Sequence, residues 1–373
     1  MDNKARTWAE IDLTAIRHNI KNIKKLLQPD TRLMSIVKAN AYGHGMVEVA
    51  QASLDEGASF LGVATLDEAL GLREAGIDVP ILVLGYIPGE YAEIVVTNNI
   101  RPTVFNINAA VDLSRAATKL GQPARVHIKI DTGMSRLGFP PEPTDIDTII
   151  KISKLPGITV EGIFTHFAVA DIEDKTFTYK QLELFKKTIF ELEKRGIHIS
   201  LQHIGNSAAI MDIPEAQLNM VRSGIITYGL YPSRKVKTER LNLIPAMRLI
   251  SRVTMIKNLP PGQSVSYGRT FTSPTKLTVA TVPAGYADGY SRLLSNRAWA
   301  VVKGHKVPLI GRVCMDQCMF DVSGAEGIKE GDEVILFGRP EDGVTVDDLA
   351  EIIGTINYEM VCLITSRVPR VYI

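Results

Sequence analysis

The sequence predicts an α/β protein with two parts: an N-terminal (β/α)8 barrel of the TIM type and a C-terminal, mostly antiparallel β domain. In the first 230 or so residues, short β-rich apolar runs alternate eight times with segments of helical periodicity, the pattern of a closed parallel barrel. Later β-rich runs are separated by Gly and Pro, as in antiparallel sheets. Between the two parts, residues 231–245 are polar and flanked by prolines, which is typical of a linker.

The barrel elements follow from this alternation of patterns. The predicted strands are residues 31–37, 60–65, 80–86, 100–105, 124–130, 158–167, 199–205 and 218–224. The predicted helices are residues 13–27, 45–57, 66–76, 90–98, 107–121, 144–155, 180–196 and 207–214. Gly76, Gly121 and Gly196 stand where three of these helices end, and glycine favours the left-handed backbone that terminates a helix.

The β domain is predicted from shorter runs. Its predicted strand regions are residues 247–259, 276–285, 299–311, 318–324 and 332–338, followed by a helix over residues 345–355. We therefore divide the chain into a barrel, residues 1–238, and a β domain, residues 239–373. Roughly the first ten residues are expected to pair with the β domain.

Composition excludes several classes of function. Lysine and arginine number 42 against 41 acidic residues, a net charge of +1, so no electrostatic argument favours nucleic acid or an anionic membrane as a partner. No apolar run approaches the roughly 20 residues that span a bilayer, and the N-terminus lacks the apolar core of a signal peptide. The 3 cysteines suit a reduced cytoplasm, and Cys314 and Cys318 are expected to be core thiols rather than metal ligands. No metal is expected.

Polar residues gather at the carboxyl ends of the predicted strands. Lys38 ends the first apolar run, although burying a lysine without a partner is costly. The strand over 124–130 alternates apolar residues with His127, Lys129 and Asp131, a stripe that cannot face the surrounding helices. Further polar residues end the sixth, seventh and eighth strands: Thr165, His166, His203, Asn206 and Arg222. Barrel enzymes build their sites at this rim, so we expect a site there, with His127 and His203 as satisfied interior histidines.

The segments after strands seven and eight predict a phosphate site. Ser207 stands at an expected helix N-cap and Gly224 at a chain reversal, where backbone N–H groups can bind phosphate. A lysine that can bond to an aldehyde, placed beside a phosphate site, suggests pyridoxal phosphate. An aldolase acting on a phosphorylated sugar fits these residues nearly as well.

Several longer stretches carry a specific resemblance. They are VKANAYGHG, KIDTGMSRLGF, THFA, HIGNSAA, VRSGIITYGLYP, SVSYGRTF, PAGYADGY, GRVCMDQCMFDV and INYEMVC, and they occur in both predicted domains. Through them the sequence resembles bacterial alanine racemase over essentially its whole length. The resemblance implies a barrel-type, pyridoxal-phosphate-dependent homodimer that interconverts L-alanine and D-alanine and supplies D-alanine for peptidoglycan.

The resemblance also implies roles for individual residues. Lys38 resembles the lysine that holds the cofactor and acts as one base, and Tyr267 resembles the second base, supplied by the partner subunit. The phosphate-binding set corresponds to Tyr42, Ser207, Gly224, Ile225 and Tyr358. Arg222 resembles the arginine that faces the pyridine nitrogen, with His166 near the ring.

The remaining implied roles concern the substrate and the entrance. Arg136 and Met315 resemble contacts to the substrate carboxylate, with Asp316 beside Met315 and Tyr286 at the entrance. Lys129 resembles a lysine that is carbamylated in many members. Two bases on opposite faces of the substrate can handle either enantiomer, and an arginine that keeps its proton leaves the pyridine nitrogen unprotonated, which disfavours transamination.

Three alternatives remain beside this hypothesis. A pyridoxal-phosphate carrier would resemble the barrel alone, and the β domain argues against it. A barrel decarboxylase would carry an acidic residue near the pyridine nitrogen, and Arg222 argues against that. A racemase that prefers serine or several amino acids stays open, because small pocket differences discriminate by only about 1–3 kcal/mol.

Overall fold

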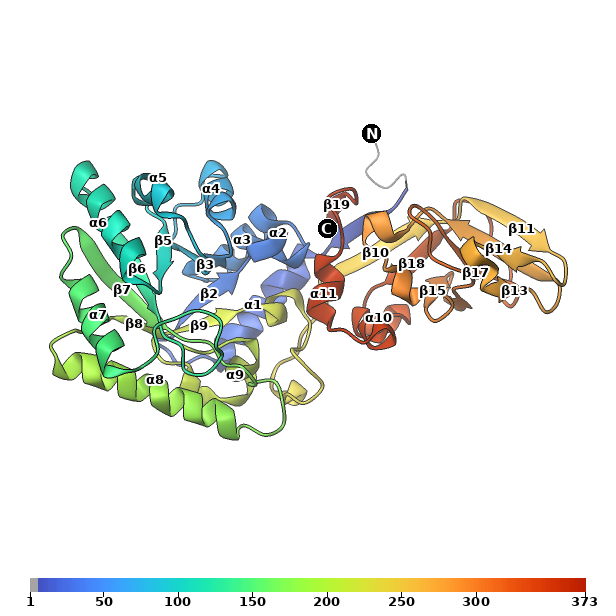
Figure 1. The fold of residues 1–373 in the computed structure, drawn as a ribbon. Helices are drawn as coiled ribbons and strands as arrows, with labels where there is room; N and C mark the ends of the chain where they lie inside the picture. The colour runs from blue at the N-terminus through green and yellow to red at the C-terminus, as the bar shows by residue number, and fades with distance from the viewer. Residues whose placement is uncertain (1–5) are drawn as a thin grey trace. The chain divides into compact units, whose positions relative to one another are not determined.

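A computed structural model describes residues 6–373 of the chain (Figure 1). The described residues form two compact units. One, the barrel unit, comprises residues 16–41 and 46–243, and the other, the β unit, comprises residues 6–15, 42–45 and 244–373. The predicted fold class, a parallel eight-stranded barrel with a mostly antiparallel β part, is confirmed. The division at residue 238 stays a prediction.

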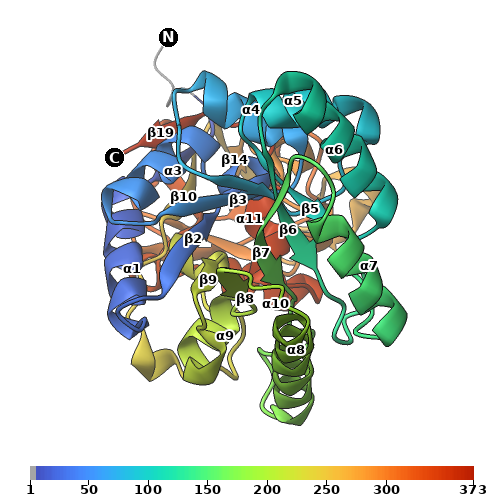
Figure 2. The ribbon, with the colours of Figure 1, turned by 90° about the vertical axis from the view of Figure 1, so that its left-hand side faces the viewer.

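The barrel unit contains a single eight-stranded sheet whose neighbouring strands are parallel (Figure 2). Its strands are β2 (Arg32–Ile36), β3 (Phe60–Val63), β4 (Ile81–Val83), β5 (Arg101–Val104), β6 (Ala124–Lys129), β7 (Ile158–Phe164), β8 (Leu201–His203) and β9 (Met220–Ser223). Each lies within one of the eight predicted runs. The segments of β8 and β9 close the ring, because Arg222 N donates to Gly205 O at 2.9 Å and Asn219 N to Gln202 O at 3.2 Å.

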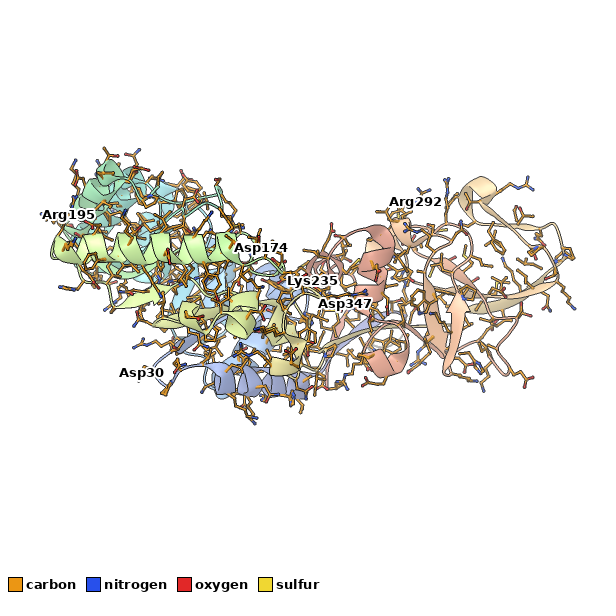
Figure 3. All side chains as sticks on the ribbon, turned by 90° about the horizontal axis from the view of Figure 1, so that it is seen from below. Asp30, Asp174, Arg195, Lys235, Arg292 and Asp347 are labelled. Carbon is orange, nitrogen blue, oxygen red and sulfur yellow. The ribbon has the colours of Figure 1, made fainter. Side chains whose placement is uncertain are left out.

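Helices surround these strands, as Figure 2 shows. They are α1 (Leu13–Leu26), α3 (Met46–Asp55), α4 (Leu66–Glu74), α5 (Ala92–Thr97), α6 (Ile107–Leu120), α7 (Pro143–Ser153), α8 (Thr176–Lys194) and α9 (Ser207–Asp212). The helix α8 begins four residues before the predicted position, since Asp174 accepts the backbone N–H of Thr176 at 2.8 Å and orders the first turn. Figure 3 labels Asp174 just before α8 and Arg195 at its end.

Single helical turns complete the chain. They are η1 (Gly89–Tyr91), η2 (Pro214–Ala216), η3 (Ile225–Tyr228), η4 (Thr238–Arg240), η5 (Tyr267–Arg269), η6 (Tyr286–Asp288), η7 (Arg292–Leu294) and η8 (Pro340–Asp342). The sequence patterns predicted none of these turns, because a run of three or four residues has no periodicity to detect. Among residues 6–373, no helix combines the length and apolar character needed to cross a bilayer.

The β unit contains three sheets. Six strands follow the order β16-β15-β18-β10-β1-β19, three the order β11-β14-β17, and β12 pairs with β13. The strands are β1 (Trp8–Ile11), β10 (Met247–Arg252), β11 (Met255–Leu259), β12 (Ser264–Val265), β13 (Phe271–Thr272), β14 (Leu277–Val282), β15 (Trp299–Val302), β16 (His305–Pro308), β17 (Cys318–Asp321), β18 (Glu333–Phe337) and β19 (Arg370–Tyr372). All pairs are antiparallel except β1 with β19. The helices are α10 (Val346–Ile353) and α11 (Asn357–Cys362).

The segment after β2, α2 (Lys38–Tyr42), is a turn of left-handed helix. Ala39, Asn40 and Ala41 have φ of 53°, 52° and 53° with ψ near 50°, and Tyr42 has φ of 51°. For residues with a Cβ, this conformation costs roughly 1–2 kcal/mol each. Glu68 holds the turn at its start, because its carboxylate accepts the N–H of Ala39 at 2.6 Å. Lys38 therefore stands at a strained exit from a strand, fixed by hydrogen bonds.

Replacing Ala39 by glycine tests this strain. Ala39 is exposed, so Ala39→Gly removes a steric cost without opening a cavity. We expect the free energy of unfolding to stay unchanged or to rise by up to about 1 kcal/mol, because relief of the left-handed strain outweighs the added flexibility of the unfolded chain. Ala109→Gly, in the right-handed helix α6, should instead cost about 1 kcal/mol. Urea unfolding followed by circular dichroism measures the free energy of unfolding of both variants. An equal loss of this free energy in the two variants would contradict the strained turn.

Candidate active site

The imidazole of His166, in the barrel unit, lies within the electrostatic influence of four lysine and arginine side chains. Burial, followed by the positive charges of Arg222, Arg136, Lys129 and Lys38, holds the pKa of His166 well below its usual value. Lys129 and Arg222 are only 5% and 4% exposed. These residues come from four places in the sequence: the exits of β2 and β6, the loop that contains Arg136, and β9. Lys38, Lys129 and Arg222 thus lie toward the carboxyl ends of β2, β6 and β9.

Arg222 is the most firmly held of these residues. Its Nη1 donates to Nδ1 and the backbone O of His203, at 2.9 Å and 3.1 Å. Its Nη2 contacts Thr165 O at 2.8 Å, His166 Nδ1 at 3.1 Å and Ile204 O at 3.2 Å. These bonds occupy the terminal nitrogens, and within the described part of the chain no acceptor is in hydrogen-bond contact with its Nε. The Nε–H donor is thus left for a ligand.

Ser207 does not cap its helix. The N-cap of α9 is Asn206, whose side chain accepts the N–H of Ala209 at 3.0 Å, so the predicted cap was wrong by one residue. Asparagine caps as well as serine does, and the sequence offered both. Ser207 is the first helical residue, and its Oγ accepts the N–H of Gly224 at 3.0 Å. Ile225 follows as the first residue of η3. The two segments predicted to bind phosphate therefore touch each other.

Lys129 is buried without a carboxylate in direct contact among the described residues. Its Nζ donates to Ile130 O at 2.8 Å and lies 5.5 Å from the centroid of the Phe164 ring. Burial and the charge of Arg222 lower the pKa of Lys129 to about 7, although Asp131 acts in the opposite direction. Asp131 Oδ1 instead accepts the backbone N–H groups of Gly133 and Ser135, at 2.9 Å and 3.0 Å, and orders the loop before Arg136. At neutral pH Lys129 therefore loses much of its charge.

The β unit holds the other predicted site residues in two groups. In the first, the rings of Tyr42 and Tyr358 lie 6.0 Å apart at 44°. Burial, followed by Cys362, raises the pKa of Tyr42, so its hydroxyl keeps its proton.

The second group lines an open depression of about 390 Å³ that includes Tyr267, Met315 and Asp316. Tyr267 and Met315 are 68% and 53% exposed, so both side chains are available to a ligand or partner. The backbone N–H groups of Tyr286 and Ala287 donate to the Cys314 and Met315 carbonyls, at 3.1 Å and 3.0 Å. Tyr286 is thus anchored beside the same loop.

Charged residues that the motifs did not identify hold the loop of residues 314–316. Arg367 bridges Asp316 at 2.6 Å and Asp288 at 3.5 Å, and Asp288 is fully buried. Arg6 adds two hydrogen bonds to the Asp288 carboxylate, at 2.8 Å and 3.0 Å. Asp288 lies within one of the quoted motifs, whereas Arg6 and Arg367 carry no pattern that marks them.

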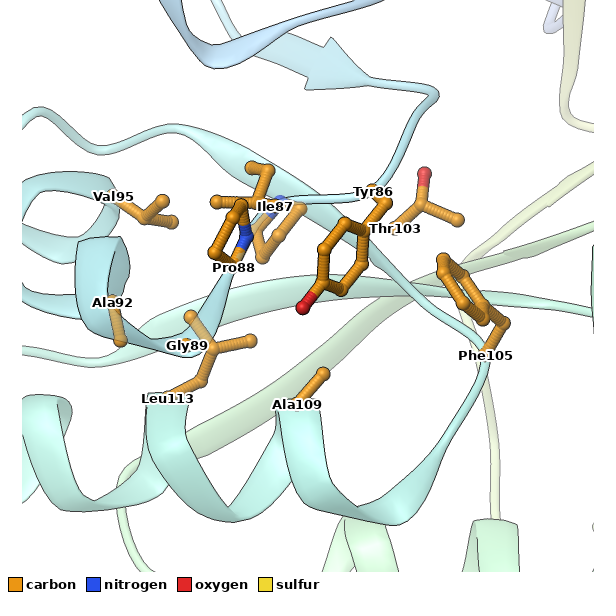
Figure 4. Close-up of a pocket in the computed structure, with 11 residues that line it drawn as sticks. Tyr86, Ile87, Pro88, Gly89, Ala92, Val95, Thr103, Phe105, Ala109 and Leu113 are labelled. Carbon is orange, nitrogen blue, oxygen red and sulfur yellow. The ribbon is translucent and has the colours of Figure 1, made fainter.

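A pocket elsewhere in the barrel unit carries no catalytic chemistry (Figure 4). It lies between η1, α5 and α6 and is lined mainly by apolar side chains such as Ile87, Val95 and Phe105. Its volume is about 20 Å³, enough for roughly one water molecule. The Thr103 hydroxyl in its wall already donates to Val83 O at 2.6 Å.

Cysteine chemistry does not add a metal site. Cys318 is buried and Cys314 partly buried, and burial raises the pKa of Cys318. Within residues 6–373, no group of three or more His, Cys, Asp or Glu side chains is arranged to hold a metal ion.

Comparison with known proteins agrees with this geometry. Residues 11–232 match the family described as "Alanine racemase, N-terminal domain", and residues 246–372 match "Alanine racemase, C-terminal domain". The chain belongs to the alanine racemase family. An alanine racemase of Clostridium perfringens is 52% identical over 369 residues, which cover 98% of this chain and 95% of that protein. One from Methanococcus maripaludis is 49% identical over 367 residues, covering 98% of each chain.

Solved structures of the family superpose closely. An alanine racemase of Clostridium difficile has a TM-score of 0.95 and 47% identity, covering 99% of this chain and 96% of that one. The Bacillus anthracis alanine racemase with bound L-Ala-P has a TM-score of 0.93 and 37% identity, covering 99% of this chain and 95% of that one. Similarity at this level extends over both units.

The lowered pKa of Lys129 gives a prediction about stability and pH. Between about pH 7 and the pKa of an unfolded lysine, 10.5, the unfolded chain binds a proton that the folded chain does not. Stability attributable to Lys129 therefore rises with pH across this window and is lowest below it. Lys129→Met should remove that slope and be the more stable protein at pH 6, by a few kcal/mol at most.

Urea unfolding of the cofactor-free protein, in buffer freed of carbon dioxide, measures the slope. Lys187→Met, at an exposed position on α8, serves as the control and should leave the slope unchanged. If the unfolding free energy changed with pH equally in the Lys129→Met variant and in the unaltered protein, the Lys129 amine would not have the lowered pKa described above.

Proposed function

We propose that this protein is an alanine racemase that uses pyridoxal phosphate and works as a homodimer. Family membership over both units supports the activity, as does the named activity of relatives matched over nearly their whole length. The observation that carries the proposal is the buried Arg222, which contacts His166 and keeps one N–H that no described acceptor takes, in a site where the charges of Arg136 and Lys38 also act on His166. Such a site calls for an anion that also offers a hydrogen-bond acceptor.

The residues fit pyridoxal phosphate on chemical grounds. Its aldehyde suits the Lys38 amine, its pyridine nitrogen suits the N–H of Arg222, and its phosphate suits the adjoining segments that begin at Ser207 and Gly224. Ser207, Gly224 and Ile225, with Tyr42 and Tyr358, would hold the phosphate. When bound, the cofactor would supply an electron-accepting ring that makes the α-hydrogen of an amino acid acidic.

The chain's own residues then determine what happens to that hydrogen. Lys38 would remove or return the proton on one face, and Tyr267 on the other. Arg136 and the backbone of Met315 would bind the alanine carboxylate. Burial lowers the pKa of Arg222 to about 9, which still leaves it a cation at neutral pH. Arg222 would therefore donate a hydrogen bond to the ring nitrogen without giving up its proton, which limits the electron demand of the ring.

Lys129 is suited to carbamylation. Its pKa of about 7 leaves a substantial fraction of neutral amine, the form that attacks carbon dioxide. The amine nitrogen bonds to the carbon of carbon dioxide, one C=O π bond becomes the carbamate C–O−, and the nitrogen releases one proton, so a neutral amine would become an anion. The carbamate would then position Arg136, whose charge also acts on Lys129 in the unmodified protein.

The assembly, the compartment and the substrate range are also part of the proposal. Tyr267 belongs to the β unit and is widely exposed, consistent with service in the site of a partner subunit. Tyr286 and Asp316 would then flank the entrance. Alanine is the proposed substrate, serine the alternative, and a cytoplasmic location with D-alanine used for peptidoglycan is the proposed setting. The match to the C-terminal domain over residues 246–372 argues against a carrier protein.

The first test concerns Lys38. The purified protein should be yellow and should racemise L-alanine, and borohydride should fix the cofactor to Lys38. Lys38→Ala should lower activity by about a thousandfold or more, the scale expected for a group that acts directly in the chemistry. Activity on alanine and serine is measured by chiral chromatography, and peptide mapping locates the reduced cofactor. Cofactor found on Lys129 would overturn the assignment.

The second test separates the two bases and their subunits. Tyr267→Ala should keep the cofactor but lose racemisation, retaining solvent exchange of the α-hydrogen for D-alanine and losing it for L-alanine. Mixing Lys38→Ala with Tyr267→Ala subunits should restore about a quarter of full activity, because about half of randomly formed dimers are mixed and each has one intact site. Mixed dimers without activity would place Tyr267 in its own subunit's site.

A further inference from the structure

A chain of hydrogen-bonded side chains crosses the barrel interior behind Arg222. Arg222 Nη1 and His203 Nδ1 lie 2.9 Å apart, and His203 Nε2 and His127 Nδ1 also lie 2.9 Å apart. His127 Nε2 is 3.4 Å from Glu161 Oε2, which Arg101 Nε approaches at 3.0 Å. Both histidines are fully buried. The chain thus connects β9, β8, β6, β7 and β5 within the barrel unit.

The bond directions that satisfy every contact in this series follow from its two ends, a guanidinium that only donates and a carboxylate that only accepts. A guanidinium only donates, so His203 Nδ1 must accept and therefore carries no proton. The proton of neutral His203 then lies on Nε2 and is donated to His127 Nδ1. His127 consequently carries its own proton on Nε2 and donates it to Glu161. A carboxylate, which only accepts, is the group that completes this order.

Other protonation states conflict with the contacts. An imidazolium at His127 would donate from Nδ1, so His203 would have to accept at Nε2 and point a protonated Nδ1 at Arg222. Burial lowers the pKa of His127 and holds that of His203 well below its usual value, so both rings stay neutral. Burial alone would raise the pKa of Glu161, but hydrogen bonds from His127 and Arg101 lower it to about 2.

The surroundings hold the rings in place. Phe164 stacks on His203 with centroids 4.7 Å apart and planes at 5°. Gly162 leaves room for His127, since a Cβ there would lie 2.3 Å from His127 Nδ1. The rings therefore cannot turn freely to exchange their nitrogens. The positions of their protons thus depend on the groups at the two ends of this series of hydrogen bonds, Arg222 and Glu161.

We propose that Glu161, itself held by Arg101, is a positioning residue that acts through His127 and His203 on Arg222. As the acceptor at the far end, it stabilises the Nε2–H tautomers that Arg222 requires at the near end, so that His203 offers a lone pair to Arg222 and holds the guanidinium with its Nε–H left for a ligand. The carboxylate also polarises the two imidazoles, which makes His203 a stronger hydrogen-bond acceptor. As a result, the hydrogen bond that Arg222 donates to its ligand becomes weaker. Only this last effect rests on the proposed function.

Nitrogen NMR of the cofactor-free protein tests the chain directly. Ring-¹⁵N histidine spectra, with the other five of the 7 histidines assigned by His→Gln substitution, report the proton positions. We expect neutral Nε2–H tautomers at His127 and His203 from pH 6 to pH 8. An imidazolium or an Nδ1–H form at either ring would overturn the proposal, and this measurement needs no variant.

Matched variants test the part played by Glu161. Arg101→Met with Glu161→Met removes both charges and leaves no unpaired arginine, but it leaves the buried His127 Nε2–H without its acceptor. Nδ1–H forms should then appear at His127, at the expense of the bond from Arg222 to His203 Nδ1, because Arg222 Nη1 keeps His203 O as an acceptor. Arg101→Met with Glu161→Gln keeps an acceptor and should retain the Nε2–H tautomers. Lys175→Met with Asp212→Met, which removes an ion pair of 2.9 Å elsewhere in the barrel unit, should also retain them. Unaltered tautomers in the first double variant would overturn the proposal.

The cofactor-loaded protein tests the last effect separately. The variant with methionine at both positions should show a shifted cofactor absorption band and a kcat lower by about tenfold, with less change in KM. The glutamine variant should recover most of both. If the tautomers change while band and kcat stay the same, the action of Glu161 on the ligand is overturned. Complete absence of cofactor binding in the unaltered protein would instead overturn the proposed function.

Discussion

The buried guanidinium of Arg222 is the constraint on which the rest of the barrel site depends. Taking a cation out of water costs several kcal/mol unless hydrogen bonds replace its hydration. Here three backbone carbonyls and two imidazoles receive the terminal N–H groups. Those acceptors come from the ends of β7 and β8, so Arg222 in β9 can be satisfied only when the barrel is closed. The same hydrogen bonds therefore close the barrel and hold the Arg222 guanidinium in its orientation.

A second consequence of Arg222 is electrostatic. After burial itself, its charge is the largest influence that lowers the pKa of both His166 and Lys129. A site that already contains one permanent cation makes further protonation unfavourable, so imidazole and amine tend to stay neutral near pH 7. Neutral amines are the form that reacts with carbon dioxide. The arginine thus prepares Lys129 for the carbamylation proposed.

The sequence predicted the parts of the structure that follow from periodicity. All eight barrel runs contain a strand, because alternation of apolar runs and amphipathic helices leaves a strong local signal. The stripe of His127 and Lys129 was also readable, since polar residues in a buried strand must face a polar interior. Glu161 lies in a similar predicted strand, but its role depends on partners 34 and 60 residues away, and spacing along one strand carries no information about them.

The turn after Lys38 shows a different limit of sequence reasoning. Four consecutive residues with φ near +50° would suggest glycine, yet the sequence there is Ala39, Asn40, Ala41 and Tyr42. Their strain of roughly 1–2 kcal/mol each is invisible to propensity rules, because it is offset by tertiary hydrogen bonds such as that from Ala39 N to Glu68. A relaxed right-handed helix would leave β2 in another direction. Selecting the strained form fixes where the chain leaves the strand at Lys38, and a residue that must reach one atom of a ligand benefits from such a fixed exit.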